Sequence, residues 1–227
     1  MIKIVKNILK IFDNYELWDE GVELIGSWCF ELYQKNFNVR KYPLKTVDID
    51  FLVPYPYRGR TKVNLVEKFE QIGFRVNFNS DGSFYLTNGE MRIDFLSPEL
   101  GRSCDKVFLI KNLSLKTIPL RYMDILLKDK VSIKEGDLNI SVPSPLNFSL
   151  HKLLIAQRRK DKSKKIKDIE QAIFTLEVVD PEKFKDEFLK LPNKAKRYIL
   201  KSLEEAKEHM PLQEEFIRNI ILTLQNN

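Results

Sequence analysis

The sequence has little of what disulfide-bonded, zinc-binding or membrane-spanning proteins require. Its 227 residues include two cysteines, Cys29 and Cys104, and two histidines. The cysteines have neither the number nor the spacing of a zinc site or a disulfide framework, so both are expected to be reduced. No apolar run approaches the roughly 20 residues that cross a bilayer. The first residues lack the apolar core and cleavage site of a signal peptide, which predicts a cytoplasmic protein that does not contact membranes.

Internal repeats and low-complexity segments are also missing. Hydrophobic residues make up 43% of the chain and charged residues 31%, a balance typical of a globular protein. The length fits one large domain or two small ones. The net charge of +6 permits a polyanionic partner, but 32 acidic residues against 38 basic ones disfavour a pure polyanion binder. Basic residues concentrate in the segment 152–167.

The candidate site is built around the segment 46–53, which alternates like a strand. Successive side chains of a strand point to opposite faces. One face is therefore apolar, with Val47, Ile49, Phe51 and Val53. Asp48 and Asp50 share the other face, with Cα atoms roughly 6.5 Å apart along the strand. For an arbitrary Asp-x-Asp, a solvated strand face is the simpler interpretation.

The segment 91–96 repeats this pattern, and the repetition favours a metal site over a solvated strand face. Met91, Ile93 and Phe95 form its apolar face, and Asp94 lies on the opposite one. If the two strands are neighbours, three carboxylates converge on one surface. Carboxylates held this close repel each other unless a cation lies between them. Oxygen ligands of this kind suit Mg²⁺ or Mn²⁺.

Hydrophobic periodicity divides the chain into two halves. Up to residue 142 it predicts helices near 2–12, 28–36 and 63–71 among short strands, at 22–25, 74–78, 84–87, 90–96, 107–110, 116–120 and 138–142. Asn88-Gly89 predicts a hairpin that places Asp94 on its second arm. Residues 121–127 are ambiguous. From residue 143 the period is helical, with helices expected near 145–160, 164–178, 181–190, 194–208 and 211–225. The prediction is an α/β domain, 1–142, followed by an all-helical domain, 143–227.

Gly26-Ser27 follows a short strand and precedes a predicted helix. Glycine lets a ligand approach the backbone, and the free N–H groups at the start of a helix favour an anion such as phosphate. Alone, the pair is no more than a turn with an N-cap. Next to three carboxylates, it suggests a phosphate-binding turn beside two metal ions. A site of this kind can catalyse in-line nucleotidyl transfer.

The order of Gly26-Ser27, Asp48-x-Asp50 and Asp94 resembles the nucleotidyltransferase superfamily related to DNA polymerase β. Farther along, the sequence is similar to the helical half of uncharacterised prokaryotic members, which carry a P…HKL…RR…K..KD..QA pattern. Here that pattern spans residues 145–172. The chain departs from many members in its longer gap, since twenty residues separate Ser27 from Asp48. The extra length, around 37–43, forms either a loop or a longer helix.

The resemblance implies an α+β fold, in which a nucleotidyltransferase-type mixed sheet with flanking helices precedes the helical domain. It also implies roles for seven residues. Asp48, Asp50 and Asp94 would hold two Mg²⁺ (or Mn²⁺), and Asp94 would help to deprotonate the attacking hydroxyl. Gly26 and Ser27 would contact the β- and γ-phosphates. Lys152 and Lys167 would point toward the triphosphate, with a solvated helix face as the alternative for each.

Other residues keep more modest interpretations. Arg92 either contacts phosphate or neutralises Asp94, and His151 is expected to be structural. The simpler interpretation of Asp168 is an ion pair with Lys164, which lies one helical turn earlier. Arg158 and Arg159 are expected at the surface or at the acceptor. Trp18, Trp28, Phe30 and Tyr33 are assigned to the core, and Tyr55 and Tyr57 are candidates for stacking on a nucleobase.

The leading functional hypothesis is transfer of a nucleoside monophosphate from an NTP to an acceptor hydroxyl. The acceptor would be an RNA 3′ end such as that of tRNA, a protein, or a small molecule such as an aminoglycoside. The basic segment 152–167 slightly favours RNA. One alternative is a non-catalytic, antitoxin-like protein of the same fold. Another is a basic RNA-binding module with coincidental aspartates.

Overall fold

The computed structural model describes residues 2–43, 46–79, 82–101 and 107–225. Its contacts divide the chain into two compact units, Met1–Leu32 with Pro43–Pro143, and Tyr33–Tyr42 with Ser144–Asn227. The division after Pro143 falls one residue from the predicted one. The sequence does not predict that residues 33–42 belong with the C-terminal helices.

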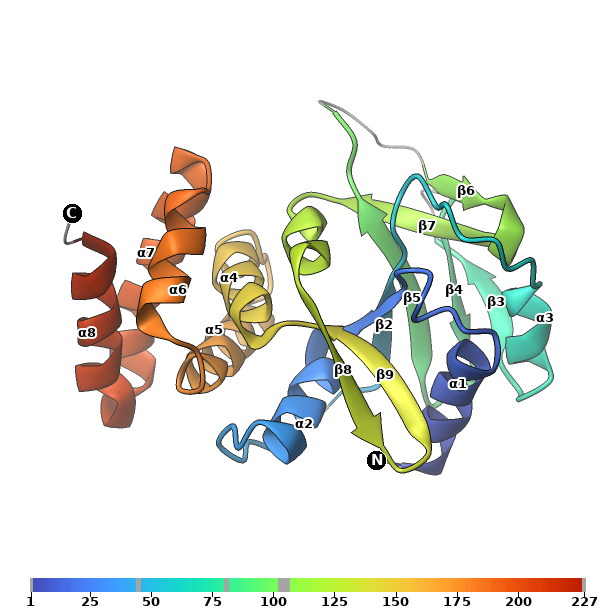
Figure 1. Cartoon of the computed structure of the whole chain (residues 1–227), viewed down its shortest axis with the longest axis horizontal. Helices are drawn as coiled ribbons and strands as arrows, with labels where there is room; N and C mark the ends of the chain where they lie inside the picture. Colours follow the sequence, from blue (N-terminus) through green and yellow to red (C-terminus); the bar gives the residue numbers. More distant parts are fainter. Residues whose placement is uncertain (1, 44–45, 80–81, 102–106, 226–227) are drawn as a thin grey trace. The chain divides into compact units, whose positions relative to one another are not determined.

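The first unit is built on a seven-stranded mixed sheet (Figure 1). The main strand order is β1 (Glu23–Ile25), β2 (Asp48–Leu52), β5 (Arg92–Pro98), β4 (Phe84–Thr87) and β3 (Arg75–Phe78). β2 and β5 run parallel, whereas β1, on the other side of β2, is antiparallel to it. The end of β5 also pairs in parallel with β7 (Leu115–Leu120), which carries β6 (Phe108–Ile110). The central strands are therefore fixed on both sides.

One face of the sheet is covered by α1 (Lys3–Asn14) and α3 (Leu65–Glu70). The ring of Phe12 stacks on Phe51 of β2 with centroids 4.0 Å apart, and Phe69 packs against Phe95 of β5 at 6.0 Å. Burial of such aromatic surface is the main source of stability. The predicted apolar face of β2 is therefore correct except for Val47, which precedes the strand and is 61% exposed.

The opposite face of the sheet is only partly covered. Ile25 and Leu52 pack there against Met123 and Leu126. These two belong to η2 (Met123–Lys128), a 3-10 helix that resolves the ambiguous segment 121–127. This face also carries Asp48, Asp50 and Asp94, because they alternate with the core residues Ile49, Phe51 and Ile93.

Two of the antiparallel strand pairs in the first unit bear directly on the sequence prediction. The one at Asn88-Gly89 joins β4 to β5, as predicted. The other joins β8 (Lys130–Glu135) to β9 (Leu138–Pro143) in a separate two-stranded sheet. The prediction for residues 107–142 omitted β8. Its half-buried Val131 and buried Ile133 alternate with exposed residues before the Gly136-Asp137 turn, so the signal was present in the sequence.

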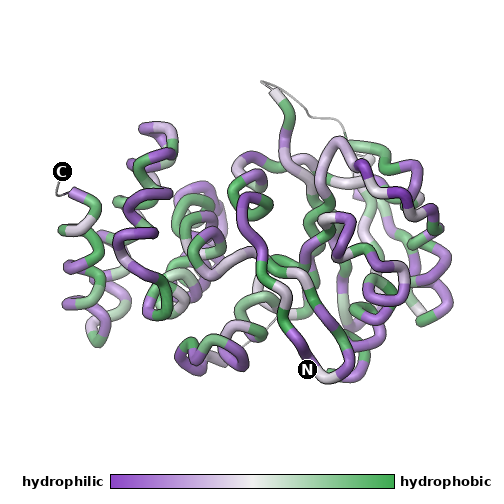
Figure 2. Tube along the Cα trace, in the orientation of Figure 1, coloured by the Kyte–Doolittle hydropathy of each residue, from purple (hydrophilic) through white to green (hydrophobic). Residues whose placement is uncertain are grey.

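The second unit consists of helices α4 (Pro145–Ala156), α5 (Lys162–Leu176), α6 (Pro181–Leu189), α7 (Asn193–His209) and α8 (Glu214–Gln225). Figure 2 shows hydrophobic and hydrophilic residues alternating along α7 and α8, the pattern of helices with one buried face. Ser144 and Asp180 cap α4 and α6, each directly before a proline at the first position. The helical C-terminal part is thus confirmed.

The segment 33–42 packs on these helices. It contains the last turn of α2 (Gly26–Asn36) and the irregular stretch that follows, so the extra length before the Asp strand is a loop. Tyr33 contacts the edge of Phe148, with ring centroids 5.1 Å apart. The Tyr42 hydroxyl donates to Glu170 at 2.6 Å, and Arg40 pairs with Glu177 at 3.1 Å. No helix in the described part of the chain has the length and apolarity to span a membrane.

Candidate active site

The register of β2 and β5 places the predicted acidic residues together. Asp50 lies directly beside Asp94, and Asp48 lies beside Arg92, on adjacent parallel strands. On the other side of β2, Asp50 pairs with Ile25, the residue before Gly26. Asp48, Asp50 and Asp94 therefore lie next to the Gly26-Ser27 turn. We call the region of the three aspartates the carboxylate edge.

Arg92 forms a bidentate ion pair with Asp94. Its Nε and one terminal nitrogen donate to the two carboxylate oxygens at 2.6 and 2.8 Å. The guanidinium also lies 3.8 Å from the ring centroid of Tyr85, a cation–π contact. The hydrogen bond to Asp94 raises the pKa of Arg92, and the charge of Asp48 adds to the effect. Arg92 therefore neutralises Asp94, which is one of the two roles that the sequence suggested. The contact of Arg92 with Tyr85 was not predicted.

The three carboxylates offer oxygen ligands alone, which is the donor set that Mg²⁺ prefers. Within the described residues, no three His, Cys, Asp or Glu side chains form a group that could hold a metal ion. The pairing explains this in part, because Arg92 takes both oxygens of Asp94. The backbone positions and donor chemistry fit a divalent cation, and a bound ion would have to compete with Arg92 for Asp94.

Gly26 is required by the geometry of Asp50. Its φ of +72° lies in the left-handed region, and a Cβ added there would sit 3.3 Å from the Asp50 carboxyl carbon and closer still to Oδ2. The carboxylate thus occupies the space that a side chain would take. Ser27 follows in the first turn of α2 and is buried. The helix begins at Gly26, two residues earlier than predicted.

Replacing Gly26 with alanine is expected to displace the Asp50 carboxylate and to lower activity at least about 10-fold, because misplacement by about 1 Å costs up to 10²-fold. Gly73→Ala is the matched control. Gly73 has a φ of +92°, and an added Cβ would meet nothing within 4 Å. Both variants carry the backbone strain of a positive φ, so their thermal midpoints should fall, while only Gly26→Ala should also lose activity. Equal activity in the two variants would contradict this account.

Lys152, one of the two lysines that the resemblance assigns to the triphosphate, belongs to an ion-pair cluster of the second unit. Lys152 and Arg159 donate to the two oxygens of Asp168 at 2.6 and 2.7 Å. Burial alone would raise the pKa of Asp168, but the charges of Lys152 and Arg159 hold it below its ordinary value. The expected Lys164 partner is therefore replaced by Lys152 and Arg159, which lie farther away in sequence. The proposed contact of Lys152 with nucleotide stays a prediction, and its ammonium is engaged within the helical unit.

The neighbours of this cluster support a structural role. His151 is buried, and its Nε2 has no hydrogen-bond partner among the described residues. Burial and the charge of Lys152 lower the pKa of His151 to about 3, so it is neutral at physiological pH. Lys167 lies half-buried on α5, next to Asp168, and remains a predicted phosphate contact. Lys165 pairs with Glu205 at 2.6 Å. Three of the eight basic residues in the segment 152–167 are thus paired with acids of their own unit, which weakens the argument for RNA.

The tyrosines suggested for base stacking are engaged within the first unit. Tyr55 stacks on Phe108 with centroids 3.9 Å apart, and the Tyr57 hydroxyl donates to Glu20. Trp18, Trp28, Phe30 and Tyr33 are buried, as predicted for core residues. Cys29 is buried, whereas Cys104 lies outside the described residues.

Comparisons with known proteins bear on this site. Residues 3–195 match a family model described as a nucleotidyltransferase. No curated protein matches the sequence. Among solved structures, the crystal structure of ANT(2″)-Ia in complex with adenylyl-2″-tobramycin is similar, with a TM-score of 0.51 at 15% identity over 86% of this chain and 94% of that one.

Two further structures are similar at lower scores. The solution structure of ANT(2″)-Ia, an antibiotic-resistance factor, has a TM-score of 0.49 at 15% identity, covering 92% of this chain and 95% of that one. An antigenic nucleotidyltransferase-like protein from Paracoccidioides brasiliensis has a TM-score of 0.46 at 12% identity, covering 94% and 93%. At these identities, the likeness to ANT(2″)-Ia in its crystal structure establishes the fold and no substrate.

Proposed function

The chain belongs to the nucleotidyltransferase family, and we propose that it moves a nucleoside monophosphate from an NTP to an acceptor hydroxyl in a metal-dependent reaction. The observation that carries this proposal is the register that sets Asp50 between Asp94 on β5 and the Gly26 turn on the other side. This edge of the sheet combines oxygen ligands for a cation with a helix start for a phosphate.

Each residue at this edge has a distinct part in the proposal. Asp48, Asp50 and Asp94 would hold two Mg²⁺ (or Mn²⁺), which when bound supply a Lewis acid for the α-phosphate and charge for the departing pyrophosphate. The backbone N–H groups at the start of α2, beside Gly26 and Ser27, would bind the β- and γ-phosphates. Asp94 would accept the proton of the attacking hydroxyl, and Arg92 would orient its carboxylate.

The ion pairs of the helical unit bear on the class of acceptor. RNA was favoured because of the segment 152–167, but Lys152, Arg159 and Lys165 are paired with acids of their own unit. A small molecule with a reactive hydroxyl therefore becomes as good a candidate as an RNA 3′ end or a protein side chain. Family membership also favours the enzyme over the antitoxin-like protein and over the RNA-binding module.

Transfer of label from each α-³²P-labelled NTP, ATP included, tests this function. The assay would offer total tRNA, whole-cell protein and an aminoglycoside such as tobramycin as separate acceptors, with Mg²⁺ or Mn²⁺. We expect label on one acceptor class, equimolar release of pyrophosphate, and loss of both on chelation with EDTA. Folded protein that labels none of these acceptors and releases no pyrophosphate from any NTP would contradict the proposal.

A further inference from the structure

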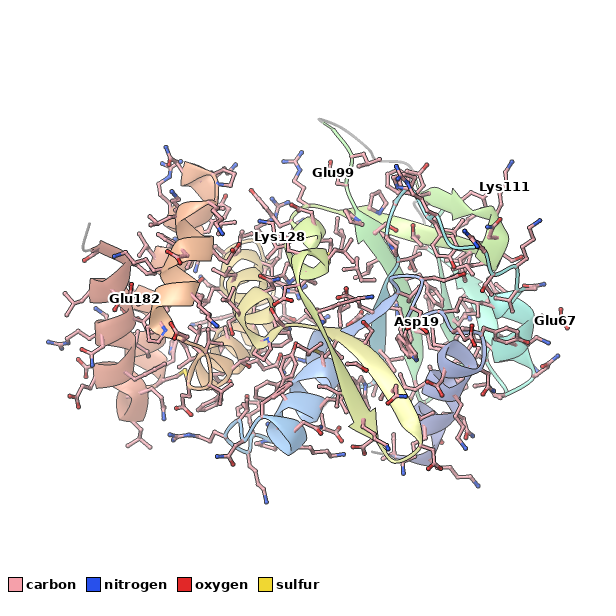
Figure 3. All side chains as sticks on the ribbon, in the orientation of Figure 1. Asp19, Glu67, Glu99, Lys111, Lys128 and Glu182 are labelled. Atoms are coloured by element: carbon pink, nitrogen blue, oxygen red, sulfur yellow. The ribbon has the colours of Figure 1, made fainter. Side chains whose placement is uncertain are left out.

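A cavity of about 570 Å³ opens in the first unit. It is lined by residues of three segments, 19–23, 54–60 and 127–130, and Figure 3 labels one of them, Asp19. Its size lies within the range of small-molecule sites. The side chain of Leu127, at the end of η2, forms part of the wall. The cluster of Ile25, Leu52, Met123 and Leu126 occupies the sheet face next to it.

Glu23 is the unusual member of this lining. It stands on β1 opposite Leu52 and is 1% exposed. Its Oε2 has no hydrogen-bond partner among the described residues. Because a buried carboxyl group without a partner costs free energy, the unsatisfied oxygen of a residue that lines a cavity points to a group that is missing. Burial raises the pKa of Glu23 to about 8, although the charge of Lys130 opposes the shift.

The walls around Glu23 are held in place by hydrogen bonds. Glu20 accepts from the backbone N–H groups of Arg60 and Thr61 at 2.8 and 2.9 Å, and from the Tyr57 hydroxyl. Gly59 leaves no room for a side chain against Glu20 and Tyr57. Lys130, another residue of the lining, donates to the Trp18 carbonyl at 3.3 Å. A wall fixed in this way loses little conformational freedom when a ligand enters.

The charges of the lining specify the ligand. When ionised, the Glu23 carboxylate accepts hydrogen bonds only, and a primary ammonium group supplies both donors and a positive charge. Arg58 and Arg60 also line the cavity and are exposed, so they can meet an anionic group. The charged groups at the cavity are four acids, Asp19, Glu20, Glu23 and nearby Asp129, and three bases, Arg58, Arg60 and Lys130, so both signs are present.

We propose that this cavity binds a small zwitterion, whose ammonium group pairs with Glu23 and whose carboxylate faces Arg58 and Arg60. The site is independent of the nucleotidyl-transfer proposal, because none of the residues that line it belongs to the carboxylate edge or the Gly26 turn. It would serve as an effector site on the same sheet, since β1 carries Glu23 and leads directly into Gly26.

Binding is coupled to a proton. In the free protein Glu23 is neutral at pH 7, whereas its ion pair with the ligand requires the carboxylate, so binding releases the Glu23 proton to the buffer. Affinity for an ammonium ligand should therefore rise about 20-fold between pH 6.5 and 8.5, as the free carboxyl ionises. Glutamine at this position cannot ionise, so the pH dependence should vanish with the affinity.

The test is a titration of ω-amino acids, from glycine to 6-aminohexanoate, followed by ¹H–¹⁵N chemical shifts of the full chain. Hexanoate and hexylamine serve as matched probes that each lack one end. We expect one length to bind best, hexylamine to bind more weakly, and hexanoate not to bind. Glu23→Gln should weaken binding at least 10-fold, whereas Glu135→Gln, a half-buried acid on β8, should have no effect.

The pH dependence of the thermal midpoint is a second test, which applies even if Glu23→Gln alters folding. Because its pKa is raised in the folded state, Glu23 stabilises least at high pH, so the wild-type thermal midpoint should fall between pH 5 and 8, and that of Glu23→Gln should fall less. Shifts confined to the lining in wild type and absent from the variant would support the site. Absence of saturable binding by every ω-amino acid at 50 mM would overturn it, as would equal affinity in Glu23→Gln.

Discussion

Asp50→Asn is expected to lower nucleotidyl transfer by more than about 10²-fold, while the chain stays folded. Asparagine keeps the size of the side chain but removes the negative charge that a divalent ion needs. Loss of groups that only support metal ligands already costs 10–100-fold, so a ligand itself should cost more. Asp50 lies between Asp94 and the Gly26 turn, so its replacement affects both parts of the candidate site.

The control for this prediction is Asp124→Asn, an exposed acid on η2 in the same unit. It should transfer label at the wild-type rate. Circular dichroism and the thermal midpoint would show whether Asp50→Asn remains folded. Removal of one of several close carboxylates relieves repulsion, so we expect its midpoint to be unchanged or higher. Transfer within twofold of wild type would remove Asp50 from the site.

Asp168→Asn should lower the free energy of unfolding by about 3–5 kcal/mol, the range for removing one partner of a buried ion pair. Asp168 is 1% exposed and Lys152 is 5% exposed, so the variant leaves a buried ammonium group without its carboxylate. The pKa of Asp168 is held low, so its contribution is present above the pKa of the unfolded chain and is lost as the pH falls through the folded value. Urea unfolding at pH 7 and pH 3 measures both effects.

Two variants calibrate this result. Glu214→Ala breaks the exposed pair with Arg218, spaced four residues apart on α8, and should cost no more than about 1 kcal/mol. Lys152→Met with Asp168→Leu replaces the buried pair by apolar side chains and should regain part of the lost stability. If Asp168→Asn unfolds at the wild-type urea concentration, the cluster does not stabilise the helical unit.

Local patterns in the sequence predicted most of the fold. Alternation identified β2 and β5, and Asn88-Gly89 identified the hairpin, because both signals depend on neighbouring residues alone. The strand β8 was missed although Val131 and Ile133 alternate with polar residues, so the signal was present in the sequence. The docking of 33–42 on the helices could not be predicted, because it depends on pairs such as Tyr42 with Glu170, 128 residues apart.

The candidate site was predictable where backbone register decides it, and less so where side chains choose among partners. Strand alternation is enough to set Asp48, Asp50 and Asp94 on one face. The partners of Asp168 could not be predicted in this way. Lys164 lies only one helical turn away, but the packing of α4 and α5 brings Lys152 and Arg159 to Asp168 instead. Glu23 gave a signal that was overlooked, since a lone acid among Val22, Leu24 and Ile25 must be buried with them.

The most direct test of the central claim is the thermal midpoint with each of the four NTPs, with and without Mg²⁺, for wild type and for the Asp48→Asn/Asp50→Asn double variant. A ligand at 100 times its dissociation constant stabilises the native state by about 2.7 kcal/mol. The account predicts a rise in midpoint with at least one NTP that requires Mg²⁺ and disappears in the double variant. No rise with any NTP, or an equal rise in the double variant, would contradict it.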